Sequence, residues 1–288
     1  MICSIIVLYK ANKNMVLSLY ESLKEQVDKL IFVKNDNTNA SFIQSLDKVV
    51  FIDLGDNYGI AYAQNRGIEE ARKTDVDWVL FSDQDTCYPP HYISDLISIS
   101  MNRKLENIGA LCPVFYDEIK KSYGELTVEK TKTTKPEIGK IYELAHTISS
   151  GTLVPMNVLE KIGGMNENLF IDFVDNEWCW RVNEKGFKIY CITNVCIHHQ
   201  LGDKMVRKLG IQIVSRSQMR FYYIIRNGYY LTTTNHLSRI EVLKYKIMLM
   251  KKGIEFLLLY GISIRNFLLI KKAKYNGLRK YFTPYEEI

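Results

Sequence analysis

The N-terminal third of the chain alternates short apolar runs with amphipathic stretches, a pattern typical of parallel strands joined by crossover helices. Apolar side chains recur every three or four residues after the capping residue Asn12 and again over residues 59–73, which predicts two helices. We therefore expect an α/β fold with a Rossmann-like, mostly parallel nucleotide-binding sheet and helices on both faces. The expected strands are Cys3–Leu8, Leu30–Val33, Val49–Leu54 and Trp78–Ser82.

Polar residues follow three of these runs at the point where each strand should end. In open α/β sheets, ligands collect beyond the carboxyl ends of the strands. Any one polar group is also ordinary turn chemistry, but three groups at one sheet edge predict a binding site. They are Asn35, Asp36 and Asn37 after the second strand, Asp56 and Asn57 after the third, and Asp83, Gln84 and Asp85 after the fourth.

The last group is a D-x-D motif, in which Asp83 and Asp85 can reach one cation if Gln84 turns away. A hard cation such as Mg²⁺ or Mn²⁺ prefers oxygen ligands and is commonly completed by substrate phosphates. Such a cation is what a diphosphate leaving group needs. We therefore predict that Asp83 and Asp85 bind Mg²⁺ or Mn²⁺.

With these motifs the chain resembles the inverting family 2 glycosyltransferases, whose fold is called GT-A, up to about Asn227. The matching segments are Ile5–Lys10, the turn Asn35–Thr38, and Asp56–Gly67, which fits an N-x-G-x-A-x-A-x-N-x-G helix. The resemblance implies a nucleotide diphosphate sugar donor. The Asp36 carboxylate could accept the ring N–H of thymine or uracil, so the donor could be a dTDP- or a UDP-sugar. The implied donor contacts are Leu8, Tyr9, Asp36, Asn57, Gly59, Asn65 and Asp83.

A second acidic group lies in the segment Phe170–Arg181. If a helix begins here, its first-turn carboxylates lie beside the positive end of the helix dipole, although an N-cap followed by an acid would look the same. The segment resembles the ED-type motif of the family's rhamnosyltransferases. That resemblance implies that Asp175 is the general base that deprotonates the acceptor hydroxyl, supported by Asp172 and Glu177.

Further site residues are also implied by the resemblance. One of two adjacent histidines, His199 rather than His198, would be a third metal ligand, because the family carries an H-x-L-G-type histidine after a strand. The small-residue loop at residues 149–152 would line the sugar and acceptor cleft. Ser150, Gly151, Trp178 and Arg181 are the residues that we expect in this cleft.

The six cysteines include no C-x-x-C pair, which predicts a reduced, cytoplasmic protein. Cys191 and Cys196 lie near the two histidines, but their spacing fits no zinc finger, so we expect buried thiols there and not a zinc site.

The C-terminal segment is basic. Residues 244–280 contain ten Lys or Arg residues against the single acid Glu255, a net charge of +9, whereas the whole chain carries +6. This asymmetry argues against nucleic acid as a partner of the main domain and favours an anionic membrane surface as a partner of the tail. The longest uncharged run, 256–264, is too short to cross a bilayer. Residues such as Leu257–Tyr260, Phe267 and Leu268 suit a helix that lies on the membrane, although an ordinary packed helical pair would have the same composition.

We expect a GT-A domain over residues 1–227, with a nucleotide-binding part up to about 115 and an acceptor part after it. Residues 228–288 should form a helical, basic extension. The predicted function is inverting transfer of L-rhamnose from dTDP-L-rhamnose to a lipid-linked glycan, in surface polysaccharide synthesis at the cytoplasmic face of the membrane. A UDP-galactose or UDP-glucose transferase and a non-catalytic sugar-nucleotide-binding scaffold remain alternatives. A nucleotidyltransferase would need a glycine-rich phosphate loop, for which Lys10–Asn12 is a poor candidate.

Overall fold

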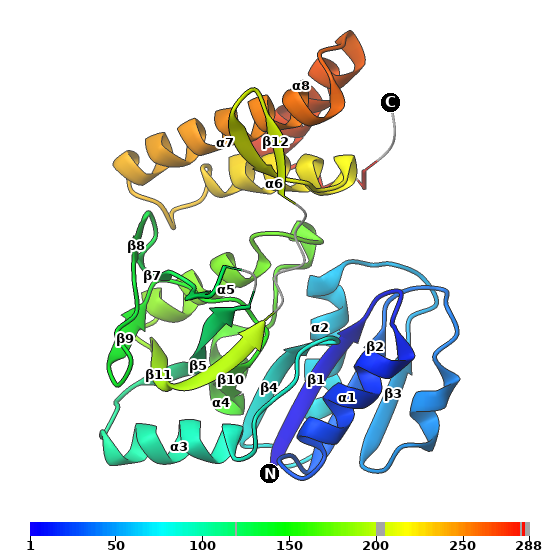
Figure 1. The fold of residues 1–288 in the computed structure, drawn as a ribbon, viewed down its shortest axis with the longest axis vertical. Helices are drawn as coiled ribbons and strands as arrows, with labels where there is room; N and C mark the ends of the chain where they lie inside the picture. Colours follow the sequence, from blue (N-terminus) through cyan, green and yellow to red (C-terminus); the bar gives the residue numbers. More distant parts are fainter. Residues whose placement is uncertain (119, 200–204, 283, 286–288) are drawn as a thin grey trace.

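The computed structural model describes residues 1–118, 120–199, 205–282 and 284–285, and its centre is a nine-stranded sheet (Figure 1). The strand order is β3-β2-β1-β4-β10-β5-β11-β9, with β6 paired to β5. Six strands share one direction, whereas β6, β9 and β10 are antiparallel to their neighbours. The strands are β1 (Ile2–Leu8), β2 (Lys29–Lys34), β3 (Val49–Asp53), β4 (Trp78–Asp83), β5 (Ile108–Asp117), β6 (Ser122–Tyr123), β9 (Ile141–Leu144), β10 (Thr152–Pro155) and β11 (Lys188–His199).

Helices cover both faces of this sheet, as predicted. Helices α1 (Lys13–Leu23) and α3 (Tyr92–Asn102) pack on one face, and α2 (Ile60–Ala71), α4 (Met156–Ile162) and α5 (Val174–Glu184) pack on the other. Asn12 caps α1 by accepting hydrogen bonds from two backbone N–H groups. At Gly67 a Cβ atom would lie 2.4 Å from Cγ2 of Ile5, so the glycine lets α2 approach β1 closely. The expected fold class is therefore confirmed.

Two short hairpins and two 3-10 turns complete the described elements. They are β7 (Leu126–Glu129) with β8 (Lys132–Thr134), β12 (Met205–Lys208) with β13 (Ile211–Val214), η1 (Ser41–Ser45) and η2 (Glu167–Leu169). The hairpin of β12 and β13 lies at the end of the molecule where the C-terminal helices are (Figure 1).

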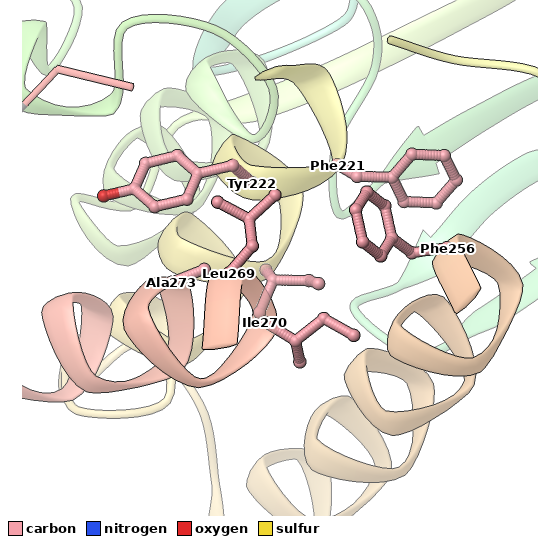
Figure 2. A pocket seen from close by; sticks show the side chains of 7 residues that line it. Phe221, Tyr222, Phe256, Leu269, Ile270 and Ala273 are labelled. Carbon is pink, nitrogen blue, oxygen red and sulfur yellow. The ribbon is translucent and has the colours of Figure 1, made fainter. Parts of the chain in front are cut away.

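A separate layer of helices lies at one end of the molecule (Figure 1). It consists of α6 (Gln218–Leu231), α7 (Arg239–Tyr260) and α8 (Ile264–Arg279), so α6 runs through the boundary that we expected at residue 227. The three helices share a core of apolar and aromatic side chains, in which Phe221 of α6 contacts Phe256 of α7 at a ring distance of 5.6 Å (Figure 2). Among the described helices, none is long and apolar enough to cross a membrane.

Two glycines set the distances between these helices. A Cβ atom at Gly228 of α6 would lie 2.3 Å from Cδ2 of Leu249, and a Cβ atom at Gly277 of α8 would lie 2.2 Å from the backbone oxygen of Arg226. The extension is therefore packed tightly against α6.

Candidate active site

The carboxyl ends of β1 and β4 meet at the topological switch point of the sheet, since the chain leaves β1 toward β2 and returns from β3 to β4. Gln84 bridges the two strands there. Its Oε1 accepts the Tyr9 N–H at 2.9 Å and its Nε2 donates to the Tyr9 carbonyl at 3.0 Å. The side chain of the middle residue of the D-x-D motif is thus held on the backbone of Tyr9. Asp83 is half-buried and Asp85 is exposed.

Asp36 shapes the turn after β2. One carboxylate oxygen accepts the Lys10 N–H, and the other accepts the N–H and hydroxyl of Thr38 at 2.9 and 2.7 Å. Burial disfavours its charged form, but these hydrogen bonds and the nearby Lys34 hold the pKa of Asp36 below its ordinary value. The side chain of Leu8 is fully buried, and its carbonyl accepts the Asn35 N–H. Asp36 is therefore an ionised acceptor at the predicted donor edge, whereas Leu8 is a core residue.

The start of α2 is built on Asn57 and Gly59. The Asn57 side-chain oxygen accepts the Gly59 N–H at 3.0 Å and the Asn35 amide at 3.2 Å. Gly59 has a φ of +88°, and a Cβ atom there would lie 2.6 Å from the carbonyl oxygen of Phe170. The N–H of Ile60 donates to that same carbonyl at 2.8 Å. The predicted donor-binding helix therefore begins directly on the loop that precedes α5.

Asn65 has a role within the protein that the sequence pattern did not reveal. Its oxygen accepts the Met165 N–H at 2.7 Å, and its amide donates to the Met165 carbonyl and to Glu167 at 2.9 and 2.7 Å. These bonds fix α2 to the loop between α4 and η2. The predicted contact of Asn65 with the donor stays a prediction, because the amide already has protein partners.

Ser149 and Ser150 connect the D-x-D motif with the predicted base. Ser150 is buried, and its hydroxyl accepts the Asp83 N–H at 3.2 Å. The backbone and the hydroxyl of Ser149 both favour the charged form of Asp175, which lowers its pKa. At Gly151, with a φ of +74°, a Cβ atom would lie 2.6 Å from Ile197, so this loop has no space for a side chain there. Two consecutive residues thus contact both acidic groups.

The environment of Asp175 favours its protonated form. Burial is the main cause, and the negative charges of Asp83 and Asp172 add to it, so that the pKa of Asp175 is raised to about 7 although Ser149 opposes the shift. Asp175 also borders a cavity of about 10 Å³ next to Trp178. A carboxyl group with a pKa near neutrality is suited to general-base catalysis.

The other residues of the ED-type segment hold structure together. Glu177 is buried and forms a two-oxygen ion pair with Arg181, at 2.9 Å between Nε and Oε1. Arg181 also donates to the carbonyls of Ile162 and Gly164, and Trp178 donates to the carbonyl of Gly163. Arg181 and Trp178 therefore fix the loop after α4. Their predicted contact with an acceptor stays a prediction.

The loop that leads into α5 is strained and is held by α6. Phe170, Asp172 and Phe173 all have a φ between +62° and +64°, a conformation that non-glycine residues rarely adopt. Asn227 of α6 donates to the carbonyls of residues 169, 171 and 172 at 2.7 to 3.0 Å. The buried Arg226 donates to the carbonyls of residues 168 and 169. Arg226 and Asn227 were not among the site residues expected from the sequence.

Asp172 itself is bound by Arg220 of α6, whose Nε lies 3.2 Å from Oδ1 and 3.3 Å from Oδ2. The carboxylate of Asp172 is therefore engaged by a cation at the start of the helical layer. Asp172 is thus bound to a cation, and Asp175 remains the predicted base.

In the described part of the chain, neither predicted histidine lies with Asp83 and Asp85 in a metal-binding group. His198 is exposed, and its Nδ1 lies 2.5 Å from Oε1 of Glu118. The side chain of His199 and the residues 200–204 of the H-x-L-G-type segment lie outside the described part of the chain. Within that part, no three His, Cys, Asp or Glu side chains come close enough to hold a metal ion.

Comparison with known proteins agrees with this fold. Residues 4–163 match the family model "Glycosyl transferase family 2". The chain is 35% identical over 243 residues to the dTDP-rhamnosyl transferase RfbF of Shigella flexneri, covering 82% of this chain and 81% of RfbF.

Two solved GT-A structures share the fold. S. aureus TarS 1-349 has a TM-score of 0.59 at 12% identity, covering 98% of this chain and 82% of TarS. GalNAc-T7, solved with UDP, GalNAc and Mn²⁺, has a TM-score of 0.57 at 10% identity, and this chain spans 57% of its length. The family match, the RfbF similarity and the GT-A fold together show that the chain belongs to glycosyl transferase family 2.

Proposed function

We propose that this glycosyltransferase moves L-rhamnose from dTDP-L-rhamnose, with inversion, to a hydroxyl group of a lipid-linked glycan during surface polysaccharide synthesis. The proposal rests above all on the Ser149–Ser150 pair, which places the D-x-D motif beside a carboxyl group whose pKa is near neutrality. The similarity to a dTDP-rhamnosyl transferase supports the choice of donor. A lipid-linked acceptor would place the enzyme at the cytoplasmic face of the membrane.

In this mechanism Asp175 takes the proton of the acceptor hydroxyl while that oxygen attacks the anomeric carbon. The bond from the anomeric carbon to the diphosphate oxygen breaks on the opposite face, and its electron pair leaves with the diphosphate, which gives inversion. The backbone and hydroxyl of Ser149 favour the charged form of Asp175. Asp36 is the acceptor available for the ring N–H of the nucleotide base.

Asp83 and Asp85 fit a divalent cation that is completed by the donor. They provide two hard oxygen ligands at a strand end, one half-buried and one exposed, and the diphosphate would supply further oxygens. A bound Mg²⁺ or Mn²⁺ stabilises the charge that develops on the leaving diphosphate. The presence of Mn²⁺ with UDP in GalNAc-T7 supports this choice of ion.

A donor panel tests the proposal without knowledge of the acceptor. Purified protein is titrated with dTDP-L-rhamnose, UDP-galactose and UDP-glucose, each with Mg²⁺, with Mn²⁺ and with excess EDTA, and binding and slow hydrolysis are measured. We expect binding and hydrolysis of dTDP-L-rhamnose only with metal present. Use of a UDP-hexose instead would overturn the rhamnosyl assignment, and binding without any hydrolysis or transfer would favour the non-catalytic scaffold.

A further inference from the structure

An open groove runs between α7 and α8, on the surface of the helical layer. Its volume is about 530 Å³, within the usual range of small-molecule sites. The lining is apolar except for Lys271 and Lys274 of α8. Two of the lining residues, Ile225 and Ile270, also belong to the core that is drawn in Figure 2. The groove is thus backed by rigidly packed side chains.

Gly253 keeps the groove open. This residue lies in the middle of the 22-residue helix α7, where a glycine costs about 1 kcal/mol relative to alanine. A Cβ atom at this position would lie 3.6 Å from Cγ2 of Ile270, which is ordinary contact distance. Alanine therefore fits, whereas a larger side chain would extend into the groove.

The rim of the groove continues into an exposed apolar stripe along α7. Its residues follow one another at spacings of three and four, so they lie on one helix face, and each is between 48% and 70% exposed. Met250 and Ile254 belong to both the stripe and the groove. On the α8 side, Phe267 is 62% exposed. The stripe consists of Ile240, Leu243, Ile247, Met250 and Ile254.

The charges around this surface are positive. Nζ of Lys274 lies 5.3 Å from the centre of the Tyr229 ring, at the wall of the groove, and neither Lys274 nor Lys271 has an ion pair with a described carboxylate. Glu255, the one acid of residues 244–280, is paired with Lys252 at 2.7 Å. A second copy of the chain would bring like charges together here, whereas a ligand with an apolar chain and a negative head would complement both features.

We propose that the groove between α7 and α8 binds the hydrocarbon chain of an anionic, phosphate-bearing lipid, with the lipid phosphate at Lys271 and Lys274. The stripe on α7 then lies among the neighbouring lipids of the same bilayer surface. This inference deepens the proposed function, because it names the surface that holds the enzyme where a lipid-linked acceptor is found.

The test is co-sedimentation of the full-length protein with vesicles of phosphatidylcholine alone and of phosphatidylcholine mixed with phosphatidylglycerol. We expect binding to the mixed vesicles only. Gly253→Leu fills the groove at unchanged net charge and should reduce binding at least tenfold, whereas the control Gly253→Ala should bind as the wild type does. The double variant Lys271→Ala/Lys274→Ala should bind about 30-fold more weakly, since each basic residue at an anionic surface contributes a factor of about five. Its charge-matched control is Lys132→Ala/Lys140→Ala, which changes two exposed lysines of the main domain.

Thermal unfolding and donor binding, measured on every variant, show whether it is folded. Equal binding of Gly253→Leu and Gly253→Ala would overturn the chain site, and equal binding of the two double variants would overturn the phosphate site. If the wild type forms dimers that Gly253→Leu disrupts, and if it does not bind vesicles, the occupant of the groove is a second copy of the chain and the proposal is overturned. Groove-dependent vesicle binding would support it even if the donor panel shows no use of dTDP-L-rhamnose, so the two proposals fail separately.

Discussion

Asp175→Asn should make the enzyme slower and its fold more stable at the same time. The pKa of Asp175 is raised from 3.8 to about 7 in the folded protein. Between these values the unfolded chain has lost the proton and the folded chain still holds it, so the stability of the wild type falls as the pH rises. At about 1.36 kcal/mol for each pH unit, the loss reaches about 4 kcal/mol above pH 7.

Asparagine keeps an oxygen that can accept the Ser149 hydrogen bonds but carries no charge. We therefore expect the variant to exceed the wild type in free energy of unfolding by about 2 to 4 kcal/mol at about pH 8, and by little at about pH 4. Sugar transfer should be at least about 100-fold slower, the scale of losing a positioned base. Glu177→Gln is the control, because it breaks the buried pair with Arg181 and should lower the stability by about 3 kcal/mol.

Urea unfolding at the two pH values and a transfer assay measure these quantities. A stability difference that is independent of pH would show that the pKa of Asp175 is not raised. Transfer at a near wild-type rate would show that another group is the base. If Glu177→Gln alone abolished transfer with donor affinity intact, the base would be Glu177.

Three further outcomes are expected. Asp85→Ala should weaken metal-dependent donor binding at least tenfold in a titration with Mn²⁺, and undiminished affinity of the wild type in excess EDTA would contradict the cation site. Asn227→Leu should lower the free energy of unfolding by about 3 kcal/mol, because three carbonyls of the strained loop lose their donor. The variant should also slow transfer more than it weakens donor binding. Urea unfolding and initial rates measure the two effects. Below pH 7, kcat/KM of the wild type should fall about tenfold per pH unit as Asp175 takes up its proton, and a flat pH profile would speak against that base.

The sheet could be predicted because its signals are local. Strand ends, the capping residue Asn12 and the close approach at Gly67 follow from short sequence patterns, and the structure confirms them. The insertion of the antiparallel strand β10 between β4 and β5 could not be predicted in this way. It depends on pairing with β4 between residues such as Thr152 and Phe81, and with β5 between Leu153 and Leu111, which lie far apart in the sequence, and periodicity carries no information on such pairing.

The roles of single polar residues were harder to predict for the same reason. Asn65 and Arg181 were assigned to ligands from their motifs. In the structure both bind backbone groups of the loop around residues 162–165, and they also bind the carboxylates of Glu167 and Glu177, respectively. Of the tail residues that we expected at the membrane, Leu257–Leu259 are half-buried, whereas Tyr260, Phe267 and Leu268 are exposed. Leu257 and Leu258 continue the three- and four-residue spacing of the exposed stripe on α7, whereas Leu259 lies on another face of the helix.

Because α6 contacts both the strained loop before α5 and the C-terminal helices, we expect these parts to behave as one cooperative unit. One side of α6 holds the carbonyls of residues 168–172, and its other contacts are set by Gly228 and Gly277 against α7 and α8. Removing α7 and α8 would expose the aromatic side chains of α6 and release the support of the strained loop. Amide hydrogen exchange in residues 168–173 should therefore rise and fall with that of α8, and anything that steadies the helical layer would slow exchange at the active site.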